Sequence, residues 1–234
     1  MVADALVYHP TVAHYLKFVG TTVGRDKVLR TLQYFARFYA WYLYRTNASE
    51  ATIKPWSAMK SQFGKTRKIM RMGKFLEHFK AAAVAFDAKN MDPVVKYLTI
   101  GRQLGYAGYL SLDFVNALDA AGIRPTPNSK KIGLDAYRFW MYGLIFSVMN
   151  SLYSLMKIRQ QFAAMDRTDG EKAVESKKLA SEQKSKTIQL IQDLLDLCSP
   201  TAALGYTNFD DGFCGIAGTI SSLIGVRSQW KKTA

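Results

Sequence analysis

An uncharged segment of 18 residues, 139–156, constrains the fold of this chain more than any other feature. As a helix it would extend about 27 Å, close to the thickness of the hydrocarbon core of a bilayer. Trp140, Tyr142 and Tyr153 near its ends are residue types that favour the lipid–water interface. Such a segment fits either of two structures. We expect a membrane-spanning helix, and a helix buried in a protein core remains the alternative.

The rest of the sequence also favours helices. Apolar residues recur every three or four positions, while alternating runs of β-branched residues are scarce. Pro93 after Asp92 is typical of a helix start, and 124–129 is a firm stop. Fifteen uncharged residues, 212–226, form a second apolar segment that is short for a full crossing. We therefore predict an all-α, membrane-associated helical bundle with amphipathic surface helices and one or two membrane-embedded helices.

The segment 60–89 has the pattern of a single basic amphipathic helix. Helical spacing places its apolar residues in one stripe, which consists of Ile69, Met72, Leu76, Phe79, Ala83 and Phe86. The interleaved cations are Lys60, Lys65, Arg67, Lys68, Arg71, Lys74 and Lys80. Glu77 is the only acid between Lys60 and Lys80. Such a helix is suited to the lipid headgroup layer, so we predict that these cations and the large apolar residues bind and insert into lipid. A surface helix that buries its stripe in a protein core is the alternative.

These segments suggest two regions. Residues 1–90 are predicted to be an N-terminal amphipathic helical region that contains the membrane-remodelling helix 60–89. Residues 91–234 are predicted to be a membrane-embedded helical region, interrupted by a charged linker at 160–186.

Small residues at helical spacing predict close helix packing in two places. Glycine lets two helices approach each other, which is a common means of association within lipid. The predicted helix-packing residues are Gly101, Gly105 and Gly108 in one segment and Gly212, Gly215 and Gly218 in the other.

The net charge of +14 calls for an anionic partner. Nucleic acid, acidic lipid and an acidic protein surface all fit the charge alone. The uncharged segment 139–156 argues against a soluble RNA-binding protein, so we predict an anionic phospholipid membrane as the partner and no nucleic acid.

No motif for catalysis, a cofactor or a metal is found. His9 and His14 are five residues apart, which does not suit a helical metal pair, and Cys198 and Cys214 lie in no metal-binding pattern. Gly64-Lys65-Thr66 ends like a phosphate-binding loop, but Met59 stands where the first glycine is needed. We predict a protein that is not an enzyme and that has no cofactor.

Three stretches carry a resemblance to a known family. GTTVGRDKVLRTLQYFARF at 20–38, the basic segment 60–89 and GFCGIAGTISSLIGVRSQW at 212–230 resemble the peroxisomal biogenesis factor 11 family, in particular its fungal branch. The resemblance covers the whole chain.

The resemblance implies a peroxisomal membrane protein that elongates and tubulates the membrane by insertion of the amphipathic helix, and so promotes proliferation and fission of the organelle. It implies homo-oligomers and two partners, a dynamin-related GTPase and a tail-anchored fission adaptor. A membrane channel for small metabolites is the alternative function. Such a channel would be lined by polar side chains such as Asp113, Asn116 and Asn150.

Overall fold

A computed structural model describes residues 7–164 and 170–234 of the chain. Within these residues the fold is all-α, as predicted, and the helices form two compact units. One unit combines Met1–Arg71 with Asn208–Ala234, and the other is Met72–Thr207. The predicted division by function, into an amphipathic region at 1–90 and a membrane-embedded region at 91–234, remains a prediction.

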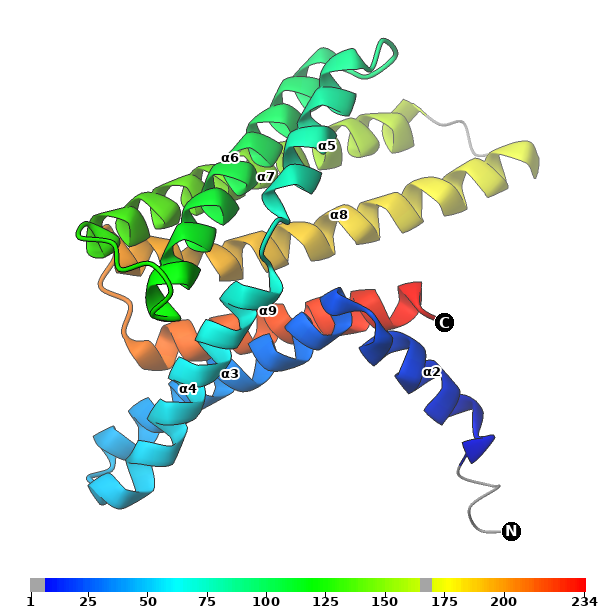
Figure 1. Cartoon of the computed structure of the whole chain (residues 1–234). Helices are drawn as coiled ribbons and strands as arrows, with labels where there is room; N and C mark the ends of the chain where they lie inside the picture. Colours follow the sequence, from blue (N-terminus) through cyan, green and yellow to red (C-terminus); the bar gives the residue numbers. More distant parts are fainter. Residues whose placement is uncertain (1–6, 165–169) are drawn as a thin grey trace. The chain divides into compact units, whose positions relative to one another are not determined.

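The helices of each unit are long and mostly consecutive in sequence (Figure 1). The first unit contains α2 (Pro10–Gly20), α3 (Thr22–Arg45), α4 (Glu50–Met70) and α9 (Asp211–Lys232). The second unit contains α5 (Phe75–Asp87), α6 (Pro93–Ala120), α7 (Ser129–Ala164) and α8 (Gly170–Ala203).

Short polar side chains cap the first turns of α6 and α9, and the start of α6 is the one that Asp92 and Pro93 predicted. The carboxylate of Asp92 accepts hydrogen bonds from the backbone N–H groups of Val94 (2.9 Å) and Val95 (3.2 Å), and Pro93 occupies the first helical position of α6. Asp210 caps α9 in the same way by accepting from the N–H of Phe213. These contacts satisfy backbone donors that lack a partner in the first turn of a helix.

In the first unit, α3 packs against both α4 and α9. The glycines of α9 make the contact with α3 close, since a Cβ added to any of them would lie within 3 Å of α3 atoms. From one end of α9 to the other, Gly212 faces Trp41, Gly215 faces Phe38 and Gly218 faces Tyr34. The two helices therefore run antiparallel, as Figure 1 shows.

In the second unit, α6 packs between α5 and α7, and α8 returns alongside α7 (Figure 1). The glycines of α6 face α7, where a Cβ on Gly105 would lie 2.6 Å from the Cα of Gly143. Gly101 and Gly108 face the rings of Phe146 and Phe139. All six predicted packing glycines thus lie against another helix of the same unit of this chain.

The predicted helix 60–89 is two helices in the structure. α4 ends at Met70 and α5 begins at Phe75. Gly73 between them has a φ of +77°, the left-handed conformation that glycine commonly supplies just after a helix end. α4 also begins earlier than predicted, with Ser49 in extended conformation before Glu50.

The predicted charged linker is largely helical where it is described. Its first residues belong to the end of α7, and its later residues belong to α8, which extends from Gly170 to Ala203. Residues 165–169 of the linker lie outside the described residues.

Candidate membrane-binding surface

α5 and the turn before it present an exposed apolar surface, which consists of Met72, Leu76, Phe79 and Phe86 and is called the α5 surface below. Leu76 is 62% exposed and Phe86 65% exposed, although both are large apolar side chains. A different side of the helix, at Ala82 and Ala85, is buried. The second unit therefore leaves the apolar residues of its part of the stripe uncovered, whereas the alternative of a surface helix that buries its stripe would require them to be covered.

Cations accompany this surface. Lys80 is exposed and Lys74 is half-buried, one on α5 and one immediately before it. Ile69, the predicted insertion residue on α4, is also exposed. Exposed aliphatic and aromatic side chains beside ammonium groups match the chemistry of the boundary between headgroups and acyl chains.

Arg67 of α4 has a different role, because it is buried in the first unit. Its Nε donates to the Asp26 carboxylate at 2.9 Å, and its Nη1 donates to the side-chain amide oxygen of Gln33 at 2.7 Å. Burial raises the pKa of Asp26, but the charges of Arg67 and Arg71 outweigh burial and hold it below the ordinary 3.8. The pair is therefore ionised, and it joins α4 to α3.

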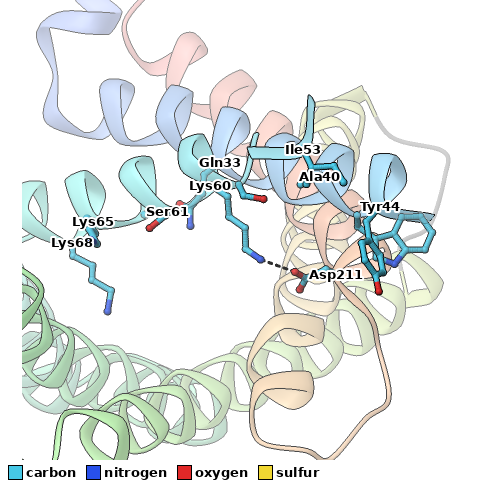
Figure 2. Close-up of a pocket in the computed structure, with 12 residues that line it drawn as sticks. Gln33, Ala40, Tyr44, Ile53, Lys60, Ser61, Lys65, Lys68 and Asp211 are labelled. Atoms are coloured by element: carbon cyan, nitrogen blue, oxygen red, sulfur yellow. Dashed lines mark hydrogen bonds and ion pairs between the residues drawn. The ribbon is translucent and has the colours of Figure 1, made fainter. Parts of the chain in front are cut away.

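Lys60 of α4 also forms an ion pair within the first unit. Its Nζ donates to the Asp211 carboxylate at 2.6 Å (Figure 2). The same carboxylate also accepts from the Nε of Arg37 at 2.8 Å. Burial raises the pKa of Asp211, but its contacts with Lys60 and Arg37 outweigh burial and lower it. One carboxylate at the start of α9 thus joins α3, α4 and α9.

The predicted lipid-binding cations therefore differ in their surroundings. Lys65 and Lys80 are exposed, whereas Lys60, Lys68, Arg71 and Lys74 are half-buried and Arg67 is buried. No local pattern in the sequence reveals the partners Asp26, Gln33 and Asp211, because each lies far from its cation in the chain.

Among the described residues, α7 is the one helix long and apolar enough to cross a membrane. It contains the predicted span 139–156. One side packs in the second unit through residues such as Trp140, Leu144 and Ser147. The other side exposes large apolar residues, which are Tyr142, Ile145, Met149, Leu152 and Met156. Phe139 and Phe146, whose rings lie against the glycines of α6, are also partly exposed.

The polar residues predicted to line a channel lie within the second unit. Asp113 and Asn116 are buried on α6. Asn150 is half-buried and donates to the Thr99 hydroxyl at 3.2 Å.

Within the described residues the fold is all-α, and α7 has the length and composition of a membrane-spanning helix. The family model described as peroxisomal biogenesis factor 11 matches residues 12–230. The chain belongs to this family, which confirms the resemblance found in the sequence. It is a protein of the peroxisomal membrane that takes part in peroxisome biogenesis.

Curated relatives are similar along their whole length. Peroxisomal membrane protein PMP27 of Saccharomyces cerevisiae is 32% identical, with 100% of both chains covered. Peroxisomal membrane protein PMP30A of Candida boidinii is 29% identical, with 100% of this chain and 99% of the relative covered. Peroxisomal biogenesis factor 11 of Schizosaccharomyces pombe is 25% identical, with 95% of this chain and 96% of the relative covered. No solved structure matches the chain.

Proposed function

We propose that this protein elongates the peroxisomal membrane by inserting the α5 surface into one leaflet. The observation that supports this most directly is the exposure of Met72 just before α5 and of Leu76, Phe79 and Phe86 on it. The small residues Ala82 and Ala85 of the same helix are buried. A helix at headgroup depth adds area to one leaflet and not to the other. That difference in area favours outward curvature of the membrane.

The cations and the apolar side chains contribute to the free energy of membrane binding in different ways. Each cation near an anionic leaflet contributes about 1 kcal/mol, before screening by salt. Each large apolar side chain contributes about 1.5 to 3 kcal/mol at full burial, of which interfacial depth realises a part. The cations therefore recruit the surface to lipid, and the apolar side chains expand the leaflet.

The test is tubulation of vesicles by the purified full chain, with Leu76→Glu and Phe79→Glu introduced together. Carboxylates at these positions remove apolar contact and repel an anionic leaflet, so we expect tubules to disappear in electron micrographs while the chain stays in the membrane. Gln62→Glu is the control, because it adds an acid at an exposed position of α4 outside the α5 surface. Unchanged tubulation by the double variant would exclude insertion of α5 as the mechanism.

The proposal extends to fission through the partners that the family resemblance implies. Further copies of the chain, a dynamin-related GTPase and a tail-anchored fission adaptor would act on the elongated membrane. Co-purification from solubilised peroxisomal membranes tests each partner separately, and recovery of the chain without the GTPase or the adaptor would remove that partner from the proposal.

A further inference from the structure

The first unit contains a cleft of about 620 Å³ that the α5 surface does not involve. It lies between α3 and α4, and Asp211 at the start of α9 contributes to its wall (Figure 2). Lys60, Lys65 and Lys68 line it from α4, and Gln33, Trp41 and Tyr44 line it from α3.

The cleft exists because one side of α4 carries small residues. Ser57, Ser61 and Gly64 are spaced by four and three positions, so they lie above one another on the helix. Glycine inside a helix costs about 1 kcal/mol relative to alanine, and so its presence needs a reason. At Gly64 a Cβ would lie 3.0 Å from the Gln33 amide nitrogen and would reduce the space.

The charge of the cleft is net positive. Three ammonium groups and one carboxylate line it, and that carboxylate, Asp211, also accepts from Arg37 at 2.8 Å. Figure 2 shows Lys60 and Lys68 extending from α4 toward the same side. Ammonium groups with nearby hydroxyl donors at Ser57 and Ser61 form charge-assisted hydrogen bonds with phosphate oxygens.

The cleft also has an apolar end. Ala40, Trp41 and Ile53 line it, and Ile53 is about 22 Å along α4 from Lys68. Aromatic and aliphatic side chains at one end and ammonium groups toward the other match the order of groups in a phospholipid, in which acyl chains join a phosphate through glycerol.

We propose that this cleft binds the phosphate ester of an anionic phospholipid headgroup, with Lys65 and Lys68 as the principal ligands of the phosphate. This site adds a specific lipid contact to the proposed function. It rests on that function in one respect, which is that the first unit lies at a membrane. Binding here is saturable and stereochemically confined, unlike attraction of a helix to a charged surface.

The test is titration of the full chain in an uncharged detergent, followed by phosphorus NMR. The lipid probe is dioctanoyl phosphatidylglycerol, and the soluble probe is sn-glycerol 3-phosphate. We expect saturable binding of the lipid and a loss of about tenfold or more in the variant with Lys65→Gln and Lys68→Gln, because two charge-assisted contacts are removed. The variant with Lys177→Gln and Lys178→Gln removes the same charge from exposed positions on α8, outside both the cleft and the α5 surface, and should bind within about twofold of the unchanged chain.

Ser61→Phe tests the site without a change of charge, since it fills the cleft. It should weaken lipid binding as strongly as the loss of both lysines. Equal weakening by the variant at Lys177 and Lys178, or full binding by Ser61→Phe, would show diffuse attraction and overturn the site. Equally tight binding of sn-glycerol 3-phosphate would assign the cleft to a soluble phosphate and overturn the lipid.

The two proposals fail separately. Loss of lipid binding by the cleft variants with normal tubulation supports the cleft and leaves α5 insertion standing. Loss of tubulation by the variant at Leu76 and Phe79 with normal titration of the cleft shows that the cleft does not depend on the α5 surface.

Discussion

At the scale of single residues, the pair Arg67–Asp26 shows how burial changes the role of a charge. Arg67 belongs to a row of cations that looks uniform in sequence, yet it is 7% exposed and contacts Asp26 and Gln33 of α3. A buried cation is tolerated when an acid and a hydrogen-bond acceptor both contact it. Arg67 therefore holds α4 in place and does not face lipid.

Asp26→Asn should destabilise the first unit by about 3 to 5 kcal/mol, because it leaves a buried guanidinium without its acid. Thermal unfolding of the full chain in detergent measures this. The matched control replaces both partners, Asp26→Leu with Arg67→Met, and should cost much less, since no buried charge remains. An unfolding midpoint of Asp26→Asn equal to that of the unchanged chain would contradict the structural role of the pair.

The same pair has a defined dependence on pH. Because the pKa of Asp26 is lower in the folded state than its ordinary 3.8, its contribution to stability is fully present above that value. The contribution is lost as the pH falls through the lowered folded pKa. The difference in midpoint between the unchanged chain and Asp26→Asn should therefore shrink under strongly acidic conditions.

At the scale of helices, glycine decides how closely they approach. The backbone of α6 meets that of α7 at Gly105 and Gly143, where no side chain separates them. Residues far from this contact, such as Gly133 on α7, have room for a Cβ, since the nearest atom would lie 3.4 Å away. Gly105 and Gly133 both lie inside helices, but only Gly105 is needed for close contact between α6 and α7.

Gly105→Ala should lower the midpoint of unfolding, because its Cβ would lie 2.6 Å from the backbone of Gly143 and the helices would have to separate. Overpacking of this kind costs about 1 to 3 kcal/mol. Gly133→Ala should leave the midpoint unchanged or raise it, because alanine favours a helix. Equal effects of the two substitutions on the midpoint would show that α6 and α7 do not pack as described.

At the scale of the whole molecule, the first unit joins the two ends of the chain. α9 covers the side of α3 that carries Tyr34, Phe38 and Trp41, and Arg37–Asp211 links the same helices. The second unit contains its own packed helices, α5 to α8. Loss of α9 should consequently affect one unit and spare the other.

A chain truncated after Thr207 tests this. Amide hydrogens of α3 and α4 should exchange much faster, because the rings of α3 lose their cover, while those of α6 and α7 keep their protection. Removal of the last two residues alone, which follow the end of α9 at Lys232, is the control and should change little. Uniform loss of protection in both units would contradict their independence.

Local chemistry made much of the fold predictable. The bounds of α2, α3 and α6 follow from helical spacing, from capping residues such as Asp92 and from glycine and proline between segments. The break at 71–74 was missed although Gly73 marks it, because the apolar stripe continues in register across it. Caps and periodicity depend on neighbours within a few residues, which is why sequence alone reveals them.

Patterns along the chain are enough to predict the helical class, the long apolar helix, the apolar stripe and the excess of positive charge. Which cations meet an acid, where glycines meet a neighbour and where α3 and α4 leave a cleft depend on how the helices pack. Lys60 and Asp211 are 151 residues apart, and Arg67 and Asp26 are 41 apart. Such partners are chosen by the packing of whole helices, and no local pattern encodes them.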